Sequence, residues 1–167
     1  GQLEDTVVIF TTDHGVAFPN MKCHLFDAGL AVSLLCRFPD GPHGSTTDSL
    51  VSHIDLFPTL CDYLDLPEPA GLAGNSFLPL RSDQDATIRE QVFGEMTYHV
   101  AYEPKRCIRT EQYKYIRRFD EAVSSEVLDN VDDGPTKEFM VERGLGDRAP
   151  PREALYDLGL EPNERDH

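Results

Sequence analysis

The sequence predicts an α/β domain followed by a small antiparallel sheet, and three observations carry this prediction. An apolar run over residues 6–12 is rich in β-branched side chains without alternation, which is typical of a strand buried on both faces of a parallel sheet. Residues 48–66 show apolar side chains at helical spacing. Three short strand-like segments follow after residue 88. We therefore expect residues 1–87 to be the end of an α/β domain and residues 88–167 to be a C-terminal subdomain.

The first part contains two predicted strands and one predicted helix. The first strand stops at Asp13-His14-Gly15, and a second apolar run over 30–38 stops at the turn signal of residues 39–42. The helix of residues 48–66 ends at a proline-rich stretch. Two parallel strands are too few for a stable sheet, which needs helices on both faces and further strands. We therefore expect the chain to be the C-terminal portion of a larger enzyme.

The second part follows a connector over residues 67–87, which is rich in Pro, Gly, Ser and Asp. A two-residue link, Glu111-Gln112, suits a hairpin although it lacks the favoured glycine. A polar, weakly patterned stretch over 120–153 separates this hairpin from the last predicted strand. The predicted strands of this part are residues 91–98, 106–110, 114–119 and 154–158.

The charge of the chain is strongly acidic, with 15 Lys and Arg against 30 Asp and Glu among 167 residues and a net charge of −15. Nucleic acids and anionic membranes both attract basic surfaces, so neither is an expected partner. No stretch approaches the roughly 20 apolar residues of a transmembrane helix. The acidic excess includes a cluster at Glu126, Asp129, Asp132 and Asp133, which we expect to be a solvated loop.

The four cysteines show no spacing that points to chemistry. None forms a CxxC or CxH pair, so a structural zinc site is not expected. Cys36 and Cys61 lie within apolar patterns, and we expect both to be small buried side chains.

Asp13-His14-Gly15 is a candidate metal site because ligands of α/β sheets gather beyond the carboxyl ends of the strands. Aspartate supplies a hard oxygen ligand and histidine a neutral nitrogen, so both side chains suit one cation. The alternative is a plain turn, in which Asp13 binds its own backbone and His14 is exposed. Lys22 lies within a loop's reach and would provide the positive charge that an anionic substrate needs beside a metal. Its alternative is an ordinary exposed lysine.

Several motifs then agree in order and spacing with one known family. The chain resembles the later half of a sulfatase of the alkaline-phosphatase superfamily over nearly its whole length. The Phe18-Pro19-Asn20-Met21-Lys22 form is most similar to the heparan N-sulfatase branch. The segments that carry the resemblance are residues 7–15, 18–22, 27–29, 53–60, 106–115 and 155–164.

The resemblance implies an α/β fold of the alkaline-phosphatase type and assigns roles to four residues. Asp13 and His14 would bind a divalent cation, usually Ca²⁺ in sulfatases. His14 stands where many sulfatases have Asn, and nitrogen is a poorer ligand for Ca²⁺ than oxygen, so Mn²⁺ or Mg²⁺ are alternatives. Lys22 would contact the sulfate oxygens in substrate binding and catalysis. His99 would contact the substrate, or else be an exposed histidine at a strand end.

One departure concerns the nucleophile. Sulfatases attack with a formylglycine made from the C/S-x-P/A-x-R motif of their first half, and none of the four cysteines here stands in that motif. We therefore expect the formylglycine in a missing N-terminal half of the same fold, and an isolated chain that does not turn over sulfated sugars or glycans. Two alternatives stay open: a phosphodiesterase or phosphonate monoester hydrolase of the same superfamily, and a non-catalytic binding module on this scaffold.

Overall fold

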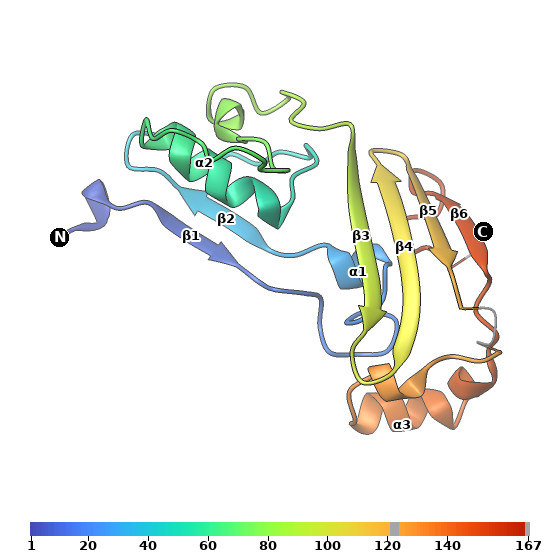
Figure 1. Ribbon diagram of the computed structural model, residues 1–167. Coiled ribbons are helices and arrows are strands. Elements are labelled where there is room, and N and C mark those ends of the chain that lie inside the picture. Colours follow the sequence, from blue (N-terminus) through green and yellow to red (C-terminus); the bar gives the residue numbers. More distant parts are fainter. Residues whose placement is uncertain (121–123, 166–167) are drawn as a thin grey trace. The chain divides into compact units, whose positions relative to one another are not determined.

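The computed structural model describes residues 1–120 and 124–165 (Figure 1). The chain divides into two compact units, one formed by Gly1–Phe10 and Leu35–Val92, the other by Thr11–Leu34 and Phe93–His167. The domain boundary expected near residue 87 stays a prediction.

The first two strands, β1 (Val8–Thr11) and β2 (Leu34–Arg37), form a two-stranded sheet. Their arrows run in opposite directions (Figure 1). At one end the Thr12 N–H donates to the Ser33 carbonyl over 3.3 Å, and at the other the Arg37 guanidinium donates to the Thr6 carbonyl. The expectation of parallel strands is therefore wrong. A parallel pair needs a long crossover, usually a helix, and this connection holds only the four-residue helix α1 (Asp27–Leu30).

Apolar side chains of this strand pair remain exposed in the chain. The exposed fractions are 41% for Val8, 57% for Phe10 and 60% for Leu35, and the Cys36 side chain is exposed as well. The expected burial of both faces, and of Cys36, is therefore wrong for this chain. An apolar run predicts a strand whose faces can be buried, whereas burial itself requires a second layer against each face.

The predicted helix is shorter than its apolar pattern. A 3-10 turn, η2 (His53–Asp55), leads into α2 (Leu56–Tyr63), which buries Pro58 and the expected Cys61. The turn begins with a capping box, because the Ser52 N–H donates to the fully buried Asp55 carboxylate over 2.7 Å. Asp55 also accepts from the Asn75 N–H over 2.8 Å and pairs with Arg89. This aspartate therefore ties the helix start to the loop that follows, including the 3-10 turn η3 (Leu78–Arg81).

The second unit contains a four-stranded sheet in the order β3-β4-β5-β6. The strand pairs β4–β5 and β5–β6 are antiparallel, and Lys114 is opposite both Arg109 and Tyr156. All four predicted strands and the Glu111-Gln112 hairpin are confirmed, although β4 begins four residues before its predicted start. The strands are β3 (Gln91–Tyr98), β4 (Tyr102–Thr110), β5 (Tyr113–Arg118) and β6 (Glu153–Asp157).

The core of this unit lies between the sheet and the segment that contains α1. Its buried members are Leu25, Cys107, Ile116, Ala154 and Tyr156. The polar stretch before β6 contains helical turns that its weak pattern does not predict: η4 (Leu128–Asn130), α3 (Pro135–Val141) and η5 (Leu145–Asp147). Within the described residues, no helix is long and apolar enough to cross a membrane.

Candidate functional site

The Asp13-His14-Gly15 turn follows directly after β1 and packs closely against α1. The Gly15 N–H donates to the Gly29 carbonyl over 3.0 Å. A Cβ atom on residue 15 would lie 1.9 Å from the Ala28 carbonyl oxygen, so only glycine fits there. The glycine therefore fixes the turn against the helix and leaves the two side chains before it free to face outward.

Asp13 and His14 together offer an oxygen and a nitrogen ligand. The Asp13 carboxylate accepts from the His14 N–H over 3.1 Å and lies 3.4 Å from His14 Nε2. His14 Nδ1 is 2.7 Å from the Gly15 carbonyl, which can only accept, so Nδ1 carries the proton, while Nε2 lies beside the Asp13 carboxylate. The side chains are 86% and 41% exposed. This arrangement suits a turn and also one edge of a cation site.

A cation site needs more ligands than these two, since zinc takes about four and calcium six to eight. Within residues 1–120 and 124–165, no three His, Cys, Asp or Glu side chains gather in a way that could hold a metal. The donor chemistry of Asp13 and His14 therefore fits at most part of a metal site within the described residues.

The loop that carries Lys22 wraps around another glycine of α1. A Cβ atom on Gly29 would lie 2.2 Å from the Met21 carbonyl oxygen and 2.5 Å from that of His24. Two loop residues other than glycine, Asn20 and Cys23, adopt the left-handed region with φ of 63°. Asparagine tolerates this region, but a cysteine there is uncommon and costs conformational energy. The strained residue stands directly beside Lys22.

Lys22 forms an ion pair with Asp132, a residue that the sequence places in the expected solvated loop. The Lys22 ammonium lies 2.8 Å and 3.2 Å from the two carboxylate oxygens. The two side chains are 21% and 39% exposed. Asp132 therefore remains partly exposed within its ion pair. The expectation of a solvated acidic loop is wrong for Glu126, whose side chain is 9% exposed and lies 2.7 Å from His24.

Electrostatics link this pair to the other candidate residues. The hydrogen bond with Asp132 raises the pKa of Lys22, and the charge of Asp13 adds to the same effect. The hydrogen bond from Lys22 lowers the pKa of Asp132, and His99 and His14 contribute further. Each of the other three groups therefore interacts electrostatically with one member of the Lys22–Asp132 pair. His99 itself is exposed and follows β3, where its N–H donates to the Ala101 carbonyl over 3.4 Å.

Cys23 is not a candidate nucleophile in spite of its position beside Lys22. Burial raises the pKa of the Cys23 thiol, so the thiol is neutral at neutral pH. The structure thus adds Asp132 to the site and adds no nucleophile from this loop.

A second cluster of charges joins three of the sequence motifs. Asp27 of α1 accepts from the Arg109 guanidinium over 3.2 Å and from the Lys114 ammonium over 2.5 Å. Lys114 also pairs with Glu164 over 2.7 Å, and Glu164 accepts from the Asp27 N–H. We call these four residues the Lys114 network. They belong to three of the segments that carry the family resemblance, residues 27–29, 106–115 and 155–164.

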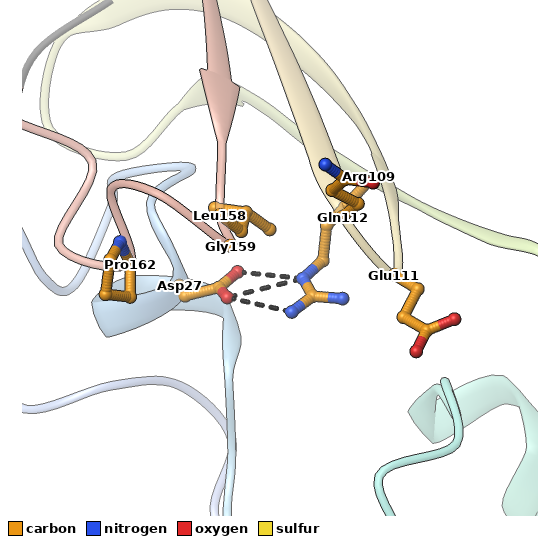
Figure 2. A pocket seen from close by; sticks show the side chains of 7 residues that line it. All are labelled: Asp27, Arg109, Glu111, Gln112, Leu158, Gly159 and Pro162. Atoms are coloured by element: carbon orange, nitrogen blue, oxygen red, sulfur yellow. Dashed lines mark hydrogen bonds and ion pairs between the residues drawn. The ribbon is translucent and has the colours of Figure 1, made fainter.

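The Lys114 network borders a hollow of about 520 Å³ (Figure 2). Figure 2 shows the Asp27 carboxylate facing the Arg109 guanidinium, while Glu111 points away from both. Burial alone would raise the pKa of Asp27, but the hydrogen bonds from Lys114 and Arg109 outweigh it and lower the pKa. Lys114 and Glu164 are 0% and 2% exposed, whereas Lys22 and Asp132 are 21% and 39% exposed, so the Lys114 network is suited to a structural role.

Three comparisons relate the chain to known proteins. A family model described as "N-sulphoglucosamine sulphohydrolase, C-terminal" matches residues 17–143. An ulvan-active sulfatase of Formosa agariphila is 34% identical over 97% of this chain and 33% of its own length. The N-sulphoglucosamine sulphohydrolase of Homo sapiens is 28% identical over 86% of this chain and 31% of its own length. The chain thus spans about a third of the length of these relatives.

A solved structure supports the fold. A protein in complex with its substrate D-glucosamine-2-N,6-O-disulfate superposes with a TM-score of 0.74, covering all of this chain and 30% of that one. The sequence identity is 19%, so this likeness concerns the fold. It agrees with the α/β class and the antiparallel subdomain expected from the sequence.

Proposed function

The chain belongs to the N-sulphoglucosamine sulphohydrolase C-terminal family, and from this we propose that the complete protein is a sulfatase acting on sulfated sugars. One observation supports the proposal beyond family membership: the Lys22 ammonium pairs with Asp132 over 2.8 Å, the charge of Asp13 acts on Lys22, and His14 and His99 act on Asp132. The substrates would be sulfate esters or N-sulfates of a sugar or glycan. The named relatives, an ulvan-active sulfatase and an N-sulphoglucosamine sulphohydrolase, support this substrate class.

Asp13 and His14 would hold a divalent cation together with ligands from outside the described residues. The Asp13 oxygens favour Ca²⁺, while the His14 Nε2 beside them suits Mn²⁺ better and leaves Mg²⁺ as a further alternative. When bound, the cation would stabilise negative charge on the sulfate oxygens. Two contacts would hold the Asp13 and His14 ligand atoms in place. They are the close packing of Gly15 against α1 and the hydrogen bond from His14 Nδ1 to the Gly15 carbonyl.

Lys22 would donate from its ammonium to a sulfate oxygen as the S–O or S–N bond of the substrate breaks. A cation in that position stabilises the charge that develops in the transition state. His99 would contact the sugar, since it is exposed at the end of β3 and its charge acts on Asp132, the partner of Lys22.

The nucleophile is the part of the reaction that these 167 residues do not supply. No C/S-x-P/A-x-R motif is present, and the Cys23 thiol has a raised pKa. We propose that a hydrated formylglycine elsewhere in the complete protein attacks sulfur through one of its hydroxyl groups, and that the chain alone is inactive. Loss of a nucleophile removes most of an enzyme's rate enhancement.

The test uses the complete protein and measures sulfate release from N-sulfoglucosamine and an aryl sulfate, with phosphate-diester hydrolysis alongside. We expect sulfate release that a chelator abolishes and Ca²⁺ or Mn²⁺ restores. Asp13→Asn should reduce it about 100-fold or more, while the control Asp5→Asn, at an exposed position of the turn η1 (Leu3–Asp5), should leave it unchanged.

Two outcomes would replace the proposal. Hydrolysis of phosphate diesters without sulfate release would identify a phosphodiesterase or phosphonate monoester hydrolase. Tight binding of sulfated disaccharides by the chain alone, with no turnover by the complete protein, would identify a non-catalytic binding module.

A further inference from the structure

The stretch from Glu126 to Asp132 contacts three separate parts of the candidate site, and we call it the 126–132 segment. Glu126 contacts the loop that carries Lys22, Asn130 contacts the hairpin that carries His99, and Asp132 contacts Lys22 itself. These contacts join residues about 30 to 110 positions apart in the chain. The 126–132 segment lies outside the segments that carry the family resemblance, so the resemblance does not predict these contacts.

Asn130 fixes the turn between β3 and β4. Its side chain is buried, with 2% exposed, and its Oδ1 accepts from the N–H groups of Val100 and Ala101 over 3.0 Å and 2.8 Å. Its Nδ2 donates to the buried Glu103 carboxylate over 3.1 Å. The turn that holds His99 is therefore set by a satisfied buried amide.

Glu126 fixes the Lys22 loop from its buried side. His24 Nε2 lies 2.7 Å from the Glu126 carboxylate, and His24 Nδ1 lies 3.1 Å from the Lys22 carbonyl. The His24 and Glu126 side chains are 3% and 9% exposed. The backbone of Lys22 is thus held independently of its side chain.

Asp132 completes the arrangement at the end of the Lys22 side chain. A lysine has a flexible four-carbon stem, and its ammonium samples many positions unless a partner restrains it. Both Asp132 oxygens lie within 3.2 Å of the ammonium, while about a fifth of the lysine side chain remains exposed. The restraint therefore leaves part of the lysine side chain open to solvent.

We propose that Asp132 is a positioning residue, which holds the Lys22 ammonium where it meets the sulfate group, within a site assembled by the 126–132 segment. This inference rests on the proposed sulfatase function. It predicts that Asp132 acts through Lys22 and makes no separate contribution to the reaction. The opposite role would be a competing anion that occupies Lys22 until substrate displaces it.

The experiment compares Asp132→Asn with the matched control Asp133→Asn in the complete protein. The control removes the same charge one residue away, where the carboxylate is 97% exposed and pairs with Lys137. We expect kcat/KM for N-sulfoglucosamine to fall about 10- to 100-fold in Asp132→Asn, the usual cost of losing an orienting partner, and to change less than about twofold in Asp133→Asn. Asp132→Glu, which keeps the charge, should recover part of the loss.

Three measurements separate positioning from a general structural effect. The double variant Lys22→Met/Asp132→Asn should be no less active than Lys22→Met alone, because Asp132 acts only through Lys22. The unfolding temperature of Asp132→Asn should match that of Asp133→Asn. Inorganic sulfate should bind more weakly to Asp132→Asn than to the control by calorimetry, a readout that does not require turnover.

The proposal is overturned if Asp132→Asn behaves like Asp133→Asn, if it becomes more active or binds sulfate more tightly, or if its effect adds to that of Lys22→Met. Failure of the proposed function looks different: wild-type protein would release no sulfate, while the sulfate-binding comparison would still report on the Lys22–Asp132 pair.

Discussion

Lys114 and Lys22 both pair with carboxylates in the second unit, but their surroundings differ. Lys114 is fully buried, lies 2.5 Å from Asp27 and 2.7 Å from Glu164, and belongs to a network whose charges satisfy one another. Lys22 is 21% exposed, and its partner Asp132 is 39% exposed. The same pair of chemical groups thus holds the fold together in one place and remains open to a ligand in the other.

The same difference shows that a residue's place in a family motif does not by itself predict a role in the candidate site. Asp27, Arg109, Lys114 and Glu164 all belong to motifs that carry the resemblance, yet they contact one another. Asp132 belongs to none of those motifs, yet it contacts the candidate site. Residues of the resemblance motifs therefore occur both in the Lys114 network and in the candidate site, and the exposed fraction of their side chains distinguishes the two groups.

The largest expected effect is on stability, in the variant Lys114→Met. Removing the ammonium leaves the Glu164 carboxylate buried at 2% exposure without its cation. Breaking a buried ion pair from one side costs about 3–5 kcal/mol of the free energy of unfolding. Chemical denaturation of the complete protein should show this loss. A change below about 1 kcal/mol would mean that the network contributes little to the fold.

A smaller effect is expected at acid pH, through Glu126. Burial alone would raise the pKa of Glu126, but the hydrogen bond from His24 and nearby positive charges outweigh it, so the folded pKa lies below the ordinary value of 4.5. A carboxyl with a lowered folded pKa stabilises the protein above its unfolded pKa, and this contribution is lost as the pH falls through the folded pKa.

Unfolding of the wild type should therefore become easier as the pH falls below about 4.5, by on the order of 1 kcal/mol for each unit of pKa lowering at Glu126. Glu126→Gln should be less stable at neutral pH and should lose less on acidification. Denaturation at neutral and acid pH measures both. Parallel pH profiles for the two proteins would contradict the assignment.

The smallest effect is expected at Asp133, whose carboxylate is 97% exposed and lies 2.8 Å from the Lys137 ammonium. Surface pairs at this spacing contribute about 0.3–0.5 kcal/mol. Asp133→Asn, which leaves the hydrogen bond from Lys137 to the Val131 carbonyl in place, should therefore change the free energy of unfolding by less than about 0.5 kcal/mol in the same denaturation assay. It is the exposed control for Lys114→Met, and equal losses in both variants would remove the distinction between buried and exposed pairs.

Local patterns in the sequence predict much of the second unit. The alternation and length of β3, β5 and β6 and the two-residue link after Thr110 define strands and a hairpin without reference to distant residues. The turn at Asp13 and His14 follows from the abrupt end of an apolar run. These features depend on neighbours along the chain, which a sequence displays directly.

The rest depends on contacts that local patterns do not contain. The direction of β2 depends on its connection to β1, which lacks a crossover helix. The exposure of Phe10 depends on whether a second layer covers the strand. The partner of Lys22 lies 110 residues away, in a stretch whose acidic composition is typical of a solvated loop. Only the positive charge of Lys22 indicated that some anion, substrate or protein, would be near it.

The most direct test of the account is the activity of Lys22→Met measured together with its unfolding temperature. Because Lys22 is assigned to the site and Lys114 to the scaffold, Lys22→Met in the complete protein should lose about 100- to 1,000-fold in kcat for N-sulfoglucosamine while its unfolding temperature stays near that of the wild type. Wild-type activity in Lys22→Met, or a loss that simply follows a lowered unfolding temperature, would contradict the account.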